Sequence, residues 1–145
     1  MASTTFSSSK VDLLAASSLF AGLNKRQLSA LNRHLDEVRI PAGRTIINQG
    51  SVGYEACVVL EGSVAIQRDG ALLETAGPGV VFGEMAMIDK GVRTASVVAV
   101  TDVKLAVLGP RSFDLAIEQI PGLAKVLLQN MSRRLRTMDE RLAAA

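Results

Sequence analysis

Several residue types are scarce in this 145-residue chain, and each scarcity excludes a class of protein. Aromatic residues make up only 3% and tryptophan is absent, so the core has to be built from Val, Leu, Ile and Ala. The single cysteine, Cys57, excludes an intrachain disulfide and fits a reducing compartment. The single histidine, His34, cannot supply a metal site made of several imidazoles, so we expect no metal and no catalytic histidine.

Net charge and long apolar runs are scarce as well. The net charge is +2, which is too small to indicate nucleic-acid binding through bulk electrostatics. The longest apolar stretch near the N-terminus, residues 11–20, is interrupted by Asp12, Ser17 and Ser18, and no cationic segment leads into a signal-like core. With 48% apolar residues the chain suits one globular domain. We therefore expect a soluble, cytoplasmic protein without a membrane partner.

The chain divides into zones of different composition. Residues 1–10 are rich in Ser and Thr and predict a flexible tail, which leaves the domain over residues 11–145. Residues 36–108 contain short runs of β-branched side chains separated by recurring glycines, and Asp69-Gly70 is typical of a tight hairpin turn. Several short strands at regular spacing predict a sandwich or a barrel-like roll rather than a parallel doubly wound sheet.

Helical patterns flank this β zone on both sides. Before it, Asn24 suits an N-cap, and Gln27 completes a capping box for an amphipathic helix. After it, Pro110 suits the first turn of one helix, Pro121-Gly122 ends that helix, and a longer helix runs to about Leu142. The longer helix carries an apolar stripe that we expect to face the core: Leu123, Leu127, Met131, Leu135, Met138 and Leu142. The predicted fold is mainly β with flanking helices, an antiparallel, jelly-roll-like β-roll with N-terminal helices and two C-terminal helices.

Residues 82–97 carry the chemistry of the chain. Gly83 permits close approach of the backbone to a ligand, and the residues after it begin a short helical turn whose amides suit a phosphate. Arg93 adds a permanent positive charge and a planar fork that matches phosphate oxygens. Glu84 would repel a phosphate unless it faces a sugar hydroxyl, and Thr94 can donate one further hydrogen bond. The segment therefore predicts a site for one phosphate and one neighbouring hydroxyl.

This segment resembles the phosphate-binding cassette of cyclic nucleotide-binding domains, as found in catabolite activator proteins, protein kinase A regulatory subunits and cyclic-nucleotide-gated channels. The resemblance rests on Phe-Gly-Glu-Met-Ala at 82–86 and Arg-Thr-Ala-Ser-Val at 93–97. It extends to residues 50–53 and 58–64, which look like the early strands of the family and their glycine turn, and to the helix break at Pro121. About 130 residues, roughly 11 to 142, are covered.

The resemblance implies a non-enzymatic module that binds cAMP or cGMP as its ligand, without a cofactor. It implies that Glu84 takes the ribose 2′-hydroxyl, that Gly83, Ala86 and Arg93 hold the cyclic phosphate, and that Thr94 favours cGMP contact as well as cAMP binding. Four further residues would line the base or its approach: Ile66, Ala76, Val81 and Phe82. The last helix would close over the purine through Arg134, Thr137 and Met138. Met85 and Ala95 complete the predicted ligand-binding set.

Two other interpretations of the sequence are compared with the prediction of a cyclic nucleotide-binding module. A degenerate domain that serves only protein–protein interaction would be expected to lose Glu84 or Arg93, and both are present. A cupin-like barrel enzyme would need several inward histidines, which a chain with one histidine cannot supply. Regulators of the resembled family continue into a helix-turn-helix after the last helix, whereas this chain ends three residues after Leu142. We therefore expect a stand-alone sensor with no nucleic-acid partner, an unknown protein partner and homodimerisation through the last helix.

Overall fold

The computed structural model describes residues 9–144, which form two antiparallel sheets flanked by helices. One sheet has the strand order β1-β8-β3-β6 and the other β2-β7-β4-β5. The strands are β1 Asp36–Ile40, β2 Thr45–Ile47, β3 Ala56–Glu61, β4 Val64–Arg68, β5 Ala71–Ala76, β6 Val81–Phe82, β7 Ser96–Ala99 and β8 Val103–Leu108. The helices are α1 Lys10–Ala16, α2 Lys25–Asn32, α3 Glu84–Asp89, α4 Pro110–Gln119 and α5 Leu123–Ala144. The predicted β-roll with flanking helices is confirmed.

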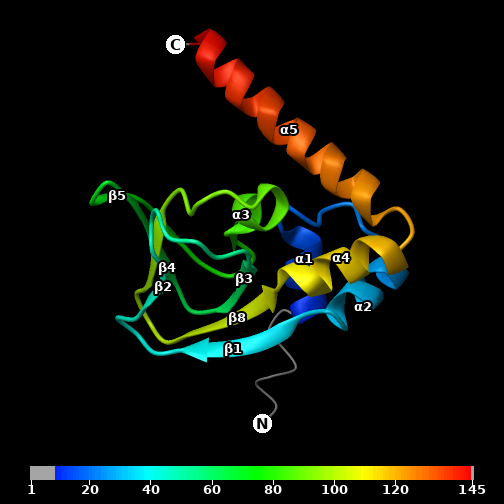
Figure 1. The fold of residues 1–145 in the computed structure, drawn as a ribbon, viewed down its shortest axis with the longest axis horizontal. Helices are drawn as coiled ribbons and strands as arrows, with labels where there is room; N and C mark the ends of the chain where they lie inside the picture. The colour runs from blue at the N-terminus through cyan, green and yellow to red at the C-terminus, as the bar shows by residue number, and fades with distance from the viewer. Residues whose placement is uncertain (1–8, 145) are drawn as a thin grey trace.

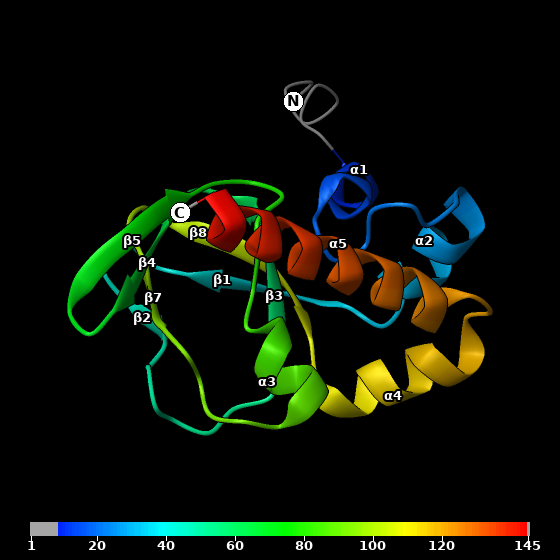
Figure 2. The ribbon, with the colours of Figure 1, turned by 90° about the horizontal axis from the view of Figure 1, so that it is seen from above.

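Two apolar clusters hold these layers together. One lies between the two sheets and is almost wholly aliphatic, with Phe82 as its aromatic member. The other joins the first sheet to α1, α2, α4 and the start of α5, with Phe20 at 1% exposure among leucines. Figure 1 shows the roll on one side of the molecule and these helices on the other, and Figure 2 shows α3 between the roll and α4. The second cluster therefore fixes the helices against the sheet from which α3 emerges.

The capping box predicted at the start of α2 is present in the structure. Asn24 Oδ1 accepts from the Gln27 amide at 2.8 Å, and Gln27 Oε1 accepts from the Asn24 amide at 2.9 Å, which is a complete capping box. The Gln27 side-chain amide also donates to the Pro121 carbonyl at 2.8 Å, so this cap holds the α4–α5 connection. Residues 1–8 of the predicted tail lie outside the described residues, but Lys10 is already helical and Ser9 caps α1.

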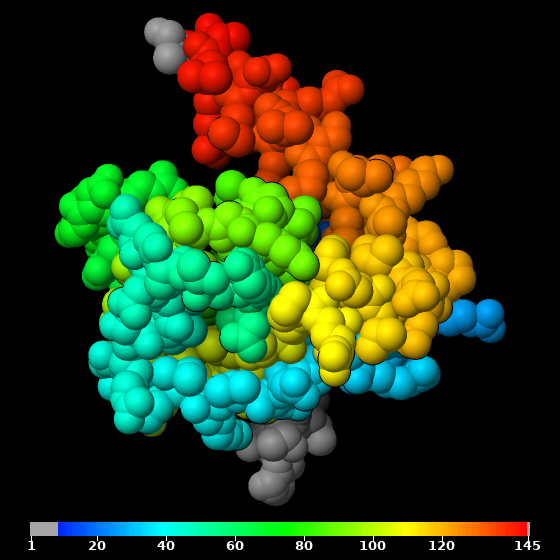
Figure 3. All heavy atoms as spheres, in the orientation of Figure 1, coloured from blue at the N-terminus to red at the C-terminus, as the bar shows by residue number. Residues whose placement is uncertain are grey.

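Helix α5 corrects one expectation about the core. Its first half is buried, with Leu123 at 1% and Leu127 at 5% exposure, but Leu135, Met138 and Leu142 are 66%, 58% and 75% exposed. Only the beginning of the apolar stripe therefore faces the core, because the helix outruns the layer that it covers. Figure 3 shows the later turns of α5 standing clear of the rest of the molecule. Among residues 9–144, no helix is long and apolar enough to cross a membrane.

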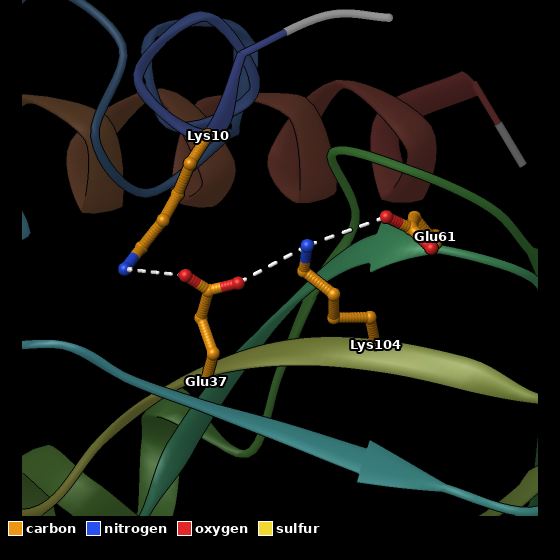
Figure 4. A network of polar contacts seen from close by, with 4 residues as sticks. All are labelled: Lys10, Glu37, Glu61 and Lys104. Carbon is orange, nitrogen blue, oxygen red and sulfur yellow. Dashed lines mark hydrogen bonds and ion pairs between the residues drawn. The ribbon is translucent and has the colours of Figure 1, made fainter. Parts of the chain in front are cut away.

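A chain of ion pairs joins α1 to the first sheet (Figure 4). Glu37 pairs with Lys10 at 3.7 Å and with Lys104 at 3.1 Å, and Lys104 pairs with Glu61 at 3.3 Å. The hydrogen bond from Lys104 lowers the pKa of Glu37 below its ordinary 4.5, and the hydrogen bond to Glu37 raises the pKa of Lys104 above 10.5. Glu37 therefore adds stability above about pH 4.5, and this contribution is lost as the pH falls through its lowered pKa.

Glu37→Gln is expected to reduce the free energy of unfolding by about 0.2–1 kcal/mol at pH 7, because the pairs are exposed to solvent and screened. The difference between wild type and variant should shrink as the pH is lowered from 7 to 3, because the wild-type carboxyl gains its proton as the pH falls through its lowered pKa. Urea unfolding at both pH values measures it, with Glu118→Gln on the exposed side of α4 as the control. An equal deficit at pH 3 and pH 7 would show that the charge of Glu37 is not the cause.

Candidate functional site

The site begins at Gly83, which lies between β6 and α3. Its φ of +81° is a left-handed conformation that favours glycine. A Cβ at this position would lie 2.6 Å from the Glu55 carbonyl oxygen and 2.7 Å from Arg93 Nη1. A side chain cannot fit there, so the glycine lets three segments of the chain meet at one point.

Arg93 is the side chain that fastens these segments together. It is 7% exposed, and its Nη1 donates to the carbonyl oxygens of Glu55 and Gly83, both at 3.0 Å. The backbone of Arg93 is also held, because its amide donates to Ser51 and its carbonyl accepts from Gly50. Within residues 9–144, only Nη1 of this guanidinium makes a hydrogen bond. The remaining N–H groups are therefore free to meet an anion.

Glu84 opens helix α3 and faces the last helix. It is 7% exposed, and its Oε1 accepts from Arg134 Nη1 of α5 at 2.6 Å. Arg134 is held in this pose by a second bond, from its Nη2 to the hydroxyl of Ser18 at 3.0 Å. A residue predicted to close over a base thus neutralises the carboxylate that is predicted to meet the ribose. Figure 1 shows α5 passing beside α3.

A cavity of about 220 Å³, here called the cassette cavity, opens between α3 and the second sheet. Ten of the predicted binding residues line it: Ile66, Val81, Phe82, Gly83, Glu84, Met85, Ala86, Arg93, Thr94 and Ala95. Ala76 does not, because it is 5% exposed and packed in the core between the sheets. Six lining residues were not predicted from the sequence: Ile47, Arg68, Leu73, Glu74, Val92 and Val97. Arg68 lies directly before the Asp69-Gly70 turn, and strand alternation from Ile66 is the signal that could have found it, whereas Glu74 lies beyond a register shift that alternation does not show.

The predicted residues of the last helix lie along a different hollow. Arg134, Thr137 and Met138 line a groove of about 470 Å³ between α5 and the segment after α1, and none of them lines the cassette cavity. Asn130 lies at the base of this groove and is 4% exposed. Its Nδ2 donates to the carbonyl oxygens of Leu19 at 2.6 Å and Ala21 at 3.0 Å. Asn130 therefore attaches the second turn of α5 to the segment after α1, while Arg134, one turn later, links α5 to the cassette.

No group of three or more His, Cys, Asp or Glu side chains in residues 9–144 is placed to hold a metal ion. Cys57 lies on β3 opposite Phe82 and is buried at 5% exposure. Burial raises the pKa of its thiol to about 12, so the thiolate that would act as a nucleophile or ligand is not formed near neutral pH.

The structure thus brings a glycine, a carboxylate and a buried arginine of a β-roll together around one cavity. Residues 37–119, more than half of the chain, match the cyclic nucleotide-binding domain family. The chain belongs to this family, and the predicted resemblance is confirmed.

Relatives in bacteria and animals carry the same domain. The chain is 31% identical over 137 residues to the CRP-like cAMP-activated global transcriptional regulator of Mycobacterium tuberculosis, covering 91% of this chain and 61% of the relative. It is 39% identical over 98 residues to a cGMP-dependent protein kinase of Caenorhabditis elegans, covering 68% of this chain and 13% of the kinase. The chain thus spans less than two thirds of the length of either relative.

Solved structures give the same fold. The N-terminal domain of a transcriptional regulator from Streptomyces coelicolor superposes with a TM-score of 0.80 at 34% identity, covering 89% of this chain and 96% of that one. The catabolite activator protein of Thermus thermophilus superposes with a TM-score of 0.78 at 34% identity, covering 88% of this chain and 62% of that one.

Proposed function

We propose that this chain is a non-enzymatic regulatory module that binds a cyclic purine mononucleotide in the cassette cavity, with cAMP as the first ligand and cGMP as the second. The observation that carries the proposal is the convergence of Gly83, Glu84 and Arg93 on one cavity. The free edge of the Arg93 guanidinium meets the cyclic phosphate, and the amides after Gly83 lie against the same group. The description of the Mycobacterium relative as cAMP-activated supports the choice of ligand.

The ion pair between Glu84 and Arg134 connects ligand binding to the last helix. Arg134 Nη1 lies 2.6 Å from Glu84 Oε1. A ribose 2′-hydroxyl that donates to Glu84 therefore competes with Arg134 for the carboxylate. Binding therefore shifts the population of α5 poses, since the ligand favours the arrangement in which Glu84 is available to it. The module reports the ligand through the position of this helix.

The exposed leucines of α5 favour a protein partner over DNA for the part of the chain that the structure describes. Leu128, Leu135 and Leu142 recur every seven residues and are 70%, 66% and 75% exposed. A stripe of this period is typical of a helix that packs against a second helix. We infer that α5 pairs with the α5 of a second copy, in line with the homodimer expected from the sequence.

The proposal is tested by calorimetric titration of the protein with cAMP, cGMP and 2′-deoxy-cAMP. Wild type should bind cAMP, and its affinity for 2′-deoxy-cAMP should be about tenfold to 150-fold lower than its affinity for cAMP. This ratio corresponds to about 1.5–3 kcal/mol, the contribution of one hydrogen bond to a charged group. Glu84→Gln should bind cAMP more weakly and show a smaller difference between the two ligands, because the charge that reads the hydroxyl is gone.

Glu118→Gln, on the exposed side of α4, is the matched control and should bind like wild type. Circular dichroism confirms that each variant is folded. A folded wild type that releases no heat with either cyclic nucleotide contradicts the proposed function and favours the interaction-only reading.

A further inference from the structure

Two charged residues of the cassette cavity, Arg68 and Glu74, are not among the residues assigned above to the phosphate or the ribose. Arg68 ends β4 and Glu74 lies on β5, and both line the cavity from the second sheet. Both side chains are exposed, so a ligand in the cavity can reach them. Their presence in a wall that is otherwise formed by Ile66 and Leu73 needs an explanation.

The register of the hairpin places the two side chains on one face. Glu74 is the cross-strand partner of Ile66, and Arg68 lies two residues beyond Ile66 on the same strand. Side chains two apart on a strand share a face, and diagonal neighbours lie within reach of long side chains. The register shifts next to this pair, and Leu73 is left without a partner. Such a bulge redirects side chains, which brings both Leu73 and Glu74 to the cavity.

A hydrogen bond orients Arg68. Its Nε donates to the Thr94 carbonyl oxygen at 3.0 Å, which fixes the plane of the guanidinium beside the cassette. Within residues 9–144, the Nη groups of Arg68 make no hydrogen bond, and no ion pair joins Arg68 to Glu74. The cavity thus presents one fixed donor group and one carboxylate acceptor side by side.

The position of this pair decides which part of a ligand meets it. In the proposed mode, Glu84 and Arg93 hold the ribose and the phosphate at the cassette end of the cavity. The phosphate and ribose of a cyclic nucleotide are fused into one rigid unit, and the base extends from it. The base therefore extends along the wall of the second sheet, where Arg68 is bonded to the Thr94 carbonyl beside the cassette and Glu74 lies on the neighbouring strand.

We propose that Arg68 and Glu74 together read the purine and select adenine over guanine, an inference that rests on the proposed function. Adenine presents an N7 acceptor next to a 6-amino donor, whereas guanine presents N7 and O6, both acceptors. Arg68 donates to N7, and Glu74 accepts from the 6-amino group of adenine. With guanine, the carboxylate of Glu74 faces the O6 oxygen, and the two acceptors repel each other.

Cyclic IMP is the sharpest probe of Glu74, because it carries O6 in place of the 6-amino group and lacks the 2-amino group of guanine. Calorimetry on wild type should give a cAMP affinity between about fivefold and about 150-fold above that for cyclic IMP and for cGMP. Glu74→Gln should bring the three affinities together, since an amide can donate to O6 as well as accept. Glu118→Gln is the matched control and should keep the wild-type ratios.

Arg68 is tested through N7 with 7-deaza-cAMP, which has a carbon at that position. Wild type should bind 7-deaza-cAMP more weakly than cAMP, and Arg68→Met should bind the two equally. Ratios between ligands cancel any general weakening caused by losing the bond to Thr94. An equal loss of affinity for every nucleotide in Arg68→Met would overturn the role of Arg68 in base reading.

The results separate this inference from the function on which it rests. A wild type that binds none of the nucleotides overturns both. A wild type that binds cAMP and cyclic IMP equally, or a Glu74→Gln variant that keeps the wild-type ratio, overturns base reading by the pair and leaves the binding function in place.

Discussion

Arg93→Met is expected to destabilise the fold and to remove nucleotide binding together. The guanidinium is 7% exposed and donates to the carbonyl oxygens of Glu55 and Gly83, so its loss leaves both without this partner. We expect the free energy of unfolding to fall by about 1–3 kcal/mol from the unsatisfied groups. The proposed affinity for cAMP should fall by about 1.5–3 kcal/mol or more, because the charged hydrogen bonds to the phosphate are gone.

Urea unfolding and calorimetry measure these two effects separately. Arg111→Met on the exposed face of α4 is the matched control and should change neither quantity. Arg93→Lys keeps the charge but not the planar fork, so it should recover part of the affinity and little of the stability. Unchanged affinity in a folded Arg93→Met protein would remove Arg93 from the phosphate site and leave it a purely structural role.

Gly83→Ala is expected to have an effect of similar size for a steric reason. A left-handed residue other than glycine costs about 1–2 kcal/mol, and here the added Cβ also meets the Glu55 carbonyl at 2.6 Å and Arg93 Nη1 at 2.7 Å. The methyl group displaces the arginine from the position in which it faces the cavity. We therefore expect a loss of stability beyond the backbone cost, together with a loss of cAMP affinity.

Gly43→Ala provides the matched control, because Gly43 has a φ of +87° and nothing within 4 Å of the added Cβ. It should show the backbone cost in thermal or urea unfolding and retain cAMP binding. If the two variants lose the same stability and both bind normally, the close approach at Gly83 is not needed for the site.

The sequence was sufficient for features that depend on neighbouring residues. The capping box of α2 needs only Asn24 and Gln27, and the Asp69-Gly70 hairpin needs only the turn residues, so both follow from local chemistry. The cassette follows as well, since Gly83 and Glu84 lie next to each other and Arg93 returns to them over a short loop. The apolar pattern of α5 was also correct as a helix, and its length was close to the observed one.

Features that depend on distant segments could not be predicted in the same way. A stripe with helical period shows that a face is apolar but not what covers it, so Leu135 and Leu142 were wrongly assigned to the core. The Glu84–Arg134 pair joins residues 50 apart and needs the packing of α5 against α3. The placement of Glu74 depends on a register shift in the hairpin, which hydrophobic alternation does not reveal.

In the proposed mechanism, the two attachments of α5 determine how far its last described turn moves when the ligand displaces Arg134. Asn130 is fixed to the carbonyl oxygens of Leu19 and Ala21, and Arg134 follows about 6 Å along the axis at 1.5 Å per residue. Ala144 lies about 21 Å from Asn130 by the same rise. For a rigid helix that turns at Asn130, a shift of about 1 Å at Arg134 becomes about 3.5 Å at the tip. Because Asn130 holds the start of this segment in place, exchanging the Glu84–Arg134 ion pair would displace the last turn of α5 about 3.5 times as far as Arg134 itself moves.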